Sequence, residues 1–146
     1  MSPLTYYIIY FQMNPDDLLE QAINTRAVAY AKYSKFAVGA ALETRSGKVF
    51  TGCNVENLSY GLTICAERNA VFAAVAAGER QFARIVIVAD SREPVTPCGA
   101  CRQVLAEFAD DLEVRSVNLQ GVEYCANLRD LLPRAKAGIL DQPRST

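Results

Sequence analysis

Two short cysteine-bearing segments place the strongest constraint on the fold, because each has the pattern of a helix start. The first is Thr63-Ile-Cys65-Ala66-Glu67-Arg68-Asn69-Ala70, and the second is Pro97-Cys98-Gly99-Ala100-Cys101-Arg102. A fold that brings these two helix starts together places three thiols around one point. Three sulfur atoms would fill three corners of a tetrahedral zinc site and leave the fourth position open for water. An open position favours catalysis over a purely structural role.

The pattern of apolar residues predicts helices packed on a sheet. Asn14 can cap the first helix, whose apolar stripe continues to about Ala31. The apolar run 85–89 is typical of a strand covered on both faces. Gly78 stands where a helix C-cap belongs. Further strands are expected at 36–42, 49–55, 114–119 and 122–125, and further helices at 65–77, 98–108 and 128–132.

Size and charge indicate one domain and limit its partners. With 146 residues, of which 51% are hydrophobic, the chain suits a single domain with its own core. The formal net charge is -1 and no run of Lys or Arg stands out, so neither nucleic acid nor an anionic membrane is an expected partner. A small neutral or weakly polar substrate fits this composition better.

The cysteine set indicates a reducing environment. There are five cysteines, an odd number, and the sequence shows no pattern of a cleavable leader. We therefore expect reduced thiols and a cytoplasmic location. The apolar stretch 6–11 is too short to span a bilayer. Cys53 and Cys125 fall on or near expected strands and are interpreted as ordinary apolar residues.

The chain has no histidine, which removes the commonest neutral zinc ligand and the commonest general base. Thiolates and carboxylates remain for those roles. Helix starts favour negative charge, and Arg68 can offset more of the charge of the thiolates. Glu67 is the candidate for proton transfer, because adjacent helical residues point about 100° apart and Glu67 cannot easily bind the same ion as Cys65.

Less specific interpretations of the same residues stay open at this point. A lone CxxC is more often half of a structural zinc site or a redox pair than a catalytic centre, and thioredoxin-like motifs also lie at helix starts. A lone cysteine in an alanine-rich helix is more often part of the core. The combination of Cys65-Ala-Glu67 with the second motif favours the catalytic interpretation.

These residues resemble the small, homotetrameric, zinc-dependent cytidine deaminases of the three-cysteine type. The paired motifs Cys-Ala-Glu and Pro-Cys-x-x-Cys match the zinc-deaminase signature, with Cys in place of His. The segments 33–42, 54–60 and 98–105 also resemble this family. The resemblance covers roughly residues 14–133, which we take as the deaminase domain, and leaves 1–13 as an extension and 134–146 as a tail.

The resemblance implies a three-layer α/β/α fold with a mixed five-stranded sheet. It implies one zinc ion per chain, held by Cys65, Cys98 and Cys101. It further implies hydrolytic deamination of cytidine and 2'-deoxycytidine in pyrimidine salvage. Water held by zinc would attack C4 of the pyrimidine, while Glu67 protonates N3 and then the departing ammonia.

Further roles follow from the resemblance, residue by residue. Asn54 and Glu56 match residues that bind the ribose hydroxyl, and Phe36 matches an aromatic side chain that lies against the base. The backbone of Ala66 and Cys98 would contact the base edge. Arg68 matches an arginine that hydrogen-bonds the zinc thiolates. Tyr60 matches a residue that reaches a neighbouring subunit's site, as expected for a homotetramer with shared active sites.

Departures from the family pattern and rival functions remain. Lys32 replaces a usual proline, and Lys136 or Ala137 falls where an aromatic residue often helps to close the pocket. A related enzyme such as blasticidin S deaminase would carry the same motifs. A non-catalytic zinc-stabilised binding module would leave Glu67, Asn54 and Glu56 without a purpose. An editing deaminase would need basic and stacking surfaces that a chain of this charge does not indicate.

Overall fold

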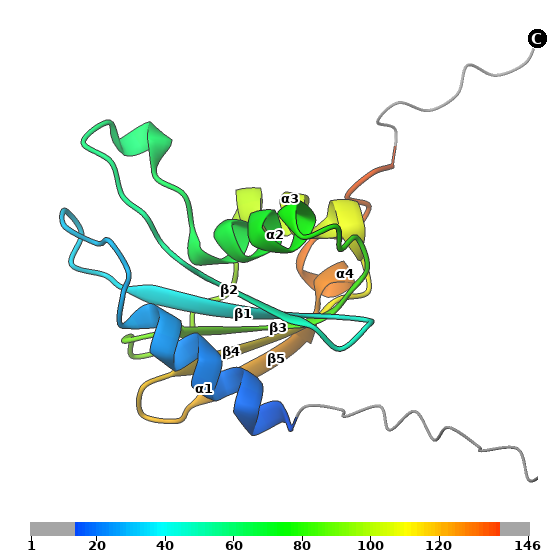
Figure 1. Ribbon diagram of the computed structural model, residues 1–146, viewed down its shortest axis with the longest axis horizontal. Coiled ribbons are helices and arrows are strands. Elements are labelled where there is room, and N and C mark those ends of the chain that lie inside the picture. The colour runs from blue at the N-terminus through cyan, green and yellow to red at the C-terminus, as the bar shows by residue number, and fades with distance from the viewer. Residues whose placement is uncertain (1–13, 138–146) are drawn as a thin grey trace, which may run out of the picture.

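A mixed five-stranded sheet organises the computed structural model, which describes residues 14–137 (Figure 1). The strands follow the spatial order β2-β1-β3-β4-β5. Strands β3 and β4 are parallel, and every other neighbouring pair is antiparallel. The bounds are β1 (Val38–Thr44), β2 (Val49–Cys53), β3 (Phe82–Ala89), β4 (Glu113–Asn118) and β5 (Glu123–Asn127).

Helices cover both faces of this sheet, so the expected three-layer α/β/α architecture is confirmed (Figure 1). Helix α1 (Pro15–Arg26) lies on one face, whereas α2 (Ala66–Ala76), α3 (Gly99–Phe108) and the short α4 (Leu128–Leu131) lie on the other. The layers divide the core into two clusters. Successive side chains of β3 point to opposite faces of the sheet. Ile85 and Ile87 therefore pack in the cluster under α2 and α3, and Val86 and Val88 pack in the cluster under α1.

Two glycines allow helices to approach the sheet closely. A Cβ atom at Gly39 of β1 would collide with backbone atoms of α1. A Cβ atom at Gly52 of β2 would collide with the Ala66 carbonyl oxygen and the Ala70 amide nitrogen of α2. The start of α2 is therefore seated directly on the end of β2.

Several predicted boundaries differ from the structure. The first helix was expected to reach about Ala31, but it ends at Arg26. The chain after Arg26 does not continue the buried face of the helix, since Val28 is 73% exposed and Tyr30 forms a parallel bridge to Val55. Strand β2 likewise ends at Cys53 instead of position 55. Gly78, at the end of α2, has the positive φ of 92° expected of a C-cap glycine.

The described residues do not test every expectation about the termini. The interpretation of 1–13 as an extension lies outside the described residues, as does most of the predicted tail. The assignment of a deaminase domain to 14–133 stays a prediction. Within the part of the chain that the structure describes, none of the helices is long and apolar enough to cross a membrane.

Candidate metal centre and active site

The two cysteine-bearing segments meet, as the helix-start pattern predicted. Cys65 is the N-cap residue of α2, Cys98 is the N-cap residue of α3, and Cys101 lies in the first turn of α3. Their sulfur atoms all lie within 4.8 Å of one another, with 3.9 Å between Cys65 and Cys98 and 3.5 Å between Cys98 and Cys101. Sulfur atoms bound to one zinc ion at about 2.3 Å and at tetrahedral angles lie roughly 3.8 Å apart. The donor set therefore fits zinc.

The site has an open side. Cys101 is buried, whereas Cys98 is exposed. Among residues 14–137, the group that could hold a metal ion consists of these three cysteines, without a fourth ligand side chain. Three protein ligands with an accessible fourth position are typical of a catalytic zinc site rather than a structural one.

Arg68 and the helix starts favour negative charge on the sulfur atoms. The hydrogen bond from the Cys101 thiol, assisted by Arg68, lowers the pKa of Cys65 to about 5. The same interaction with Cys65, together with burial, raises the pKa of Cys101. Arg68 Nη2 lies 3.4 Å from Cys65 Sγ, and this contact raises the pKa of the arginine. A metal-free site therefore carries a thiolate on Cys65 and keeps the proton on Cys101.

Glu67 is held beside the three sulfur atoms in a nearly dry environment. It lies in the first turn of α2, and it is 5% exposed. Burial raises the pKa of Glu67 to about 7, and the negative charge of Cys65 contributes. A carboxyl group with a pKa near neutrality can both accept and return a proton, which is what general acid–base catalysis requires.

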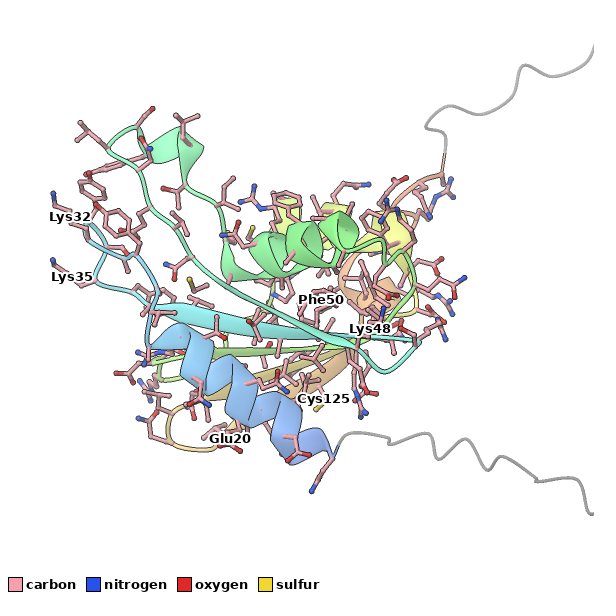
Figure 2. The ribbon with its side chains drawn as sticks, viewed as in Figure 1. Glu20, Lys32, Lys35, Lys48, Phe50 and Cys125 are labelled. Carbon is pink, nitrogen blue, oxygen red and sulfur yellow. The ribbon has the colours of Figure 1, made fainter. Side chains whose placement is uncertain are left out.

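A cleft of about 250 Å³ connects this centre to most of the predicted substrate-binding residues. The residues that the sequence singled out and that line the cleft are Phe36, Asn54, Glu56, Cys65, Ala66, Glu67 and Cys98. The end of β2 delivers Asn54 and Glu56, and the loop before β1 delivers Phe36. Figure 2 shows Lys32 and Lys35 in that loop, at one edge of the molecule and well away from Cys125 on β5.

Glu56 organises the loop before β1. Its carboxylate accepts hydrogen bonds from the amides of Tyr33 (2.8 Å) and Ser34 (3.0 Å) and from the Ser34 hydroxyl. The hydroxyl contact is the main reason that the pKa of Glu56 is lowered. The amide of Phe36 in turn donates to Ser34 Oγ at 3.0 Å. A carboxylate, a hydroxyl and the backbone of Phe36 are thus linked in series.

Asn54 fixes the other side of the same loop. Its Oδ1 accepts a hydrogen bond from the Val38 amide at 2.8 Å, and its Nδ2 donates to the Phe36 carbonyl at 2.8 Å. The side chain is 8% exposed. Both halves of the amide therefore hold the segment that begins β1, and each half keeps capacity for one further hydrogen bond.

Two of the singled-out positions lie apart from the cleft. Tyr60 is 74% exposed and lines a neighbouring hollow, with its ring 5.7 Å from that of Tyr33. Lys136 and Ala137 line a hollow beside Asp110. Neither position contributes to the cleft within one chain.

The sequence analysis missed several residues of the cleft. Each of them has a side chain of a common type, to which the sequence analysis assigned no role. A signal was available for three of them, since Ser34 and Val38 lie in the segment 33–42 that resembles the family and Thr63 begins the first cysteine-bearing segment. The missed residues are Ser34, Val38, Thr63, Val95 and Thr96.

A three-layer α/β/α fold with three thiols and a buried carboxylate at two helix starts defines the class of zinc-dependent deaminases. In agreement, a family model described as "cytidine and deoxycytidylate deaminase zinc-binding region" matches residues 13–115. The chain belongs to the cytidine deaminase family, whose members are zinc hydrolases.

Individual relatives agree with this assignment. A cytidine deaminase from Halalkalibacterium halodurans is 49% identical over 124 residues, which are 84% of this chain and 94% of that protein. The crystal structure of cytidine deaminase from Burkholderia pseudomallei has 53% sequence identity and a TM-score of 0.81, over 83% of this chain and 98% of that one. A blasticidin-S deaminase from Bacillus cereus is 30% identical over 125 residues, 80% of this chain and 88% of that protein.

Proposed function

We propose that this chain hydrolytically deaminates cytidine and 2'-deoxycytidine to uridine and 2'-deoxyuridine. The observation that carries the proposal is the position of Glu67, a buried carboxyl group beside three thiols at one end of a cleft. The other lining residues suit a nucleoside, because they offer an aromatic ring and hydrogen-bonding groups in one cleft of limited size.

The chain's own residues would perform binding, orientation and proton transfer. Cys65, Cys98 and Cys101 would hold the zinc ion, which would supply an activated water when bound. Glu67 takes the two protons of the attacking water in turn, and delivers the first to N3 of the pyrimidine and the second to the amino group that leaves C4 as ammonia, while the water oxygen remains on C4 as the carbonyl oxygen of the product. Its pKa of about 7 suits both steps.

The remaining cleft residues would hold the nucleoside so that its base lies within reach of Glu67. Phe36 lies against the base, and the backbone of Ala66 and Cys98 contacts the base edge. The ribose hydroxyl donates a hydrogen bond to the Glu56 carboxylate and accepts one from Asn54 Nδ2. Glu56 suits this role because its lowered pKa keeps it ionised at neutral pH.

A direct assay tests the proposal. Purified protein is mixed with cytidine, and the ultraviolet change of the base is followed while zinc is counted per chain. Turnover with one zinc ion per chain is expected. One bound zinc ion without turnover would favour a non-catalytic binding module. Parallel assays with 2'-deoxycytidine and blasticidin S under identical conditions define the substrate, and a preference for blasticidin S would contradict the proposal.

We further infer that the working form is a cytoplasmic homotetramer with shared active sites. The segment that follows β2 carries apolar side chains that are exposed on the single chain, with exposures of 79% for Leu58, 74% for Tyr60 and 65% for Leu62. A second copy of the chain would cover them. A reducing compartment would keep the thiols available for zinc.

Complementation in mixed assemblies tests the shared sites. Tyr60→Ala and Glu67→Gln variants are expected to be weak or inactive when each is assembled alone. Mixed assembly would create some sites with an intact Glu67 and a partner's intact Tyr60, so activity should rise above that of either variant. No gain on mixing, in assemblies shown to contain both chains, would contradict shared sites without affecting the proposed reaction.

A further inference from the structure

The segment 91–98 forms one wall of the cleft and ends at a candidate zinc ligand. Val95 and Thr96 line the cleft, and Cys98 follows directly. The segment belongs to neither a helix nor a strand, so no ladder of backbone hydrogen bonds fixes it. Its beginning is anchored by Asn118, whose Nδ2 donates to the carbonyls of Ser91 (3.1 Å) and Arg92 (3.0 Å).

Arg102 anchors the other end of this wall. Its Nε donates to the Pro97 carbonyl at 2.7 Å, and its Nη2 donates to Thr96 Oγ1 at 2.9 Å. The third bond runs from Nη1 to the Leu131 carbonyl at 3.0 Å, at the end of α4. One guanidinium group thus joins the cleft wall to a helix that lies on the same face of the sheet (Figure 1).

We propose that Arg102 is a positioning residue for the metal centre and the cleft. It holds the wall so that Cys98 stays in reach of the ion and Thr96 keeps facing the cleft. The backbone amide of Arg102 also donates to the Cys98 carbonyl at 2.9 Å, so the arginine lies one helical turn beyond the ligand that it supports. The inference rests on the proposed function, because it concerns the same site.

The planar fork of arginine suits this role. Three separate acceptors, a backbone carbonyl, a hydroxyl and a second carbonyl, receive bonds from three different nitrogen atoms. Lysine keeps the positive charge but presents a single ammonium group on a flexible stem, which cannot reproduce this geometry. Arg102→Lys therefore removes the positioning while it preserves the charge.

Arg80 provides a matched control. Its Nη1 donates to the carbonyls of Val75 (2.8 Å) and Glu79 (2.9 Å), so it also braces the end of a helix through backbone oxygens. Neither acceptor lines the cleft. Arg80→Lys accordingly makes the same chemical change without touching the wall.

The experiment compares the holoenzyme with Arg102→Lys and Arg80→Lys by zinc transfer to a chromogenic chelator and by the absorption spectrum of the cobalt-substituted site. Loss of one or two net hydrogen bonds corresponds to about a tenfold effect. Arg102→Lys should therefore release zinc about tenfold faster, change the cobalt spectrum and raise KM for cytidine. Arg80→Lys should resemble the wild type. A lower melting temperature with unchanged zinc release, spectrum and KM would show a purely structural role and overturn the proposal.

Thr96→Val gives a second variant that keeps the shape of the side chain and removes one acceptor of Arg102. Its effect on KM should be large in the wild-type background and small in Arg102→Lys, because both changes break the same contact. Fully additive effects would overturn the proposed link. If the wild type binds zinc but does not turn over cytidine, the proposed reaction fails, and the zinc-release and cobalt measurements still decide the role of Arg102.

Discussion

The guanidinium of Arg68 donates a hydrogen bond to the sulfur atom of Cys65, with 3.4 Å between Nη2 and Sγ. The two residues lie three positions apart at the start of α2, so the helix itself sets their spacing. Three thiolates around a zinc ion carry a net charge of about -1, which opposes activation of water. The arginine offsets part of this charge next to the ion.

Arg68→Gln should therefore reduce catalysis while the zinc site persists. A hydrogen bond to a charged group contributes about 1.5–3 kcal/mol, so kcat should fall about tenfold to a hundredfold. The measurement pairs kcat with zinc content per chain. Arg45→Gln serves as control, because Arg45 forms its ion pair with Asp111 on the exposed surface. An unchanged kcat in Arg68→Gln would exclude this role.

Glu67→Gln should nearly abolish deamination and leave zinc bound. The substitution keeps the shape of the side chain and removes its ability to carry a proton, a role worth about 100-fold to 10,000-fold in rate. The cytidine assay and zinc analysis are carried out on the same preparation. Zinc loss in proportion to lost activity would point to Glu67 as a ligand instead of a proton carrier.

The raised pKa of Glu67 predicts a pH dependence of stability in the metal-free protein. The folded chain holds this proton more tightly than the unfolded chain, since the pKa rises from 4.5 to about 7. The contribution of Glu67 to stability is therefore complete below pH 4.5 and is lost as the pH rises through 7. Relative to Glu67→Gln, the free energy of unfolding of the wild type should fall across this window by up to about 3 kcal/mol.

Denaturant unfolding of both proteins with a chelator present measures this difference. Groups that titrate identically in the two proteins cancel in the comparison. A difference that is constant between pH 4 and pH 8, or that grows in favour of the wild type at higher pH, would contradict the sign.

Asn54→Asp should weaken the loop before β1. The carboxylate can still accept from the Val38 amide, but it places an oxygen against the Phe36 carbonyl, where Nδ2 now donates. A stability loss of about 1–3 kcal/mol and a higher KM are expected. Asn57→Asp is the control, because the Asn57 side chain accepts a hydrogen bond from the Ser59 amide in an exposed turn, and a carboxylate oxygen can accept the same bond. Equal effects of the two substitutions would refute the argument.

Gly52→Ala should displace α2 from the sheet. The added methyl group would collide with the backbone at Ala66 and Ala70, and backbone cannot swing aside as a flexible side chain can. Overpacking of this kind costs about 1–3 kcal/mol, and the shift should also weaken zinc binding by moving Cys65. Thermal unfolding and chelator competition measure the two effects.

The metal centre could be predicted because its ligands lie in two short sequence motifs. A cysteine at a helix start with a glutamate two residues later can be recognised in a few positions, and the structure confirms that Cys65, Cys98 and Cys101 form one cluster. The three-layer fold was implied by the resemblance to the deaminase family, whereas the continuous apolar run 85–89 itself indicated a strand covered on both faces, which the two core clusters confirm.

The missing parts of the site depend on contacts between distant positions. Arg102 donates a hydrogen bond to the Leu131 carbonyl, 29 positions further along the chain, and the sequence around neither residue predicts that contact. The end of α1 was predicted too late because the apolar pattern continues through Val28, although Val28 is exposed and Tyr30, two residues further on, pairs with Val55. The periodicity of a sequence indicates which residues are apolar, but it does not indicate which other parts of the chain pack against them.

The series of hydrogen bonds from Glu56 through Ser34 to Phe36 has a consequence for enzyme engineering. A library that varies position 56 to obtain a new sugar preference would also release Ser34, whose hydroxyl accepts a hydrogen bond from the Phe36 amide. With the roles proposed for Glu56 and Phe36, sugar and base recognition would be coupled through these hydrogen bonds, and a variant selected for one would need compensating changes in residues 33–36 to keep the other.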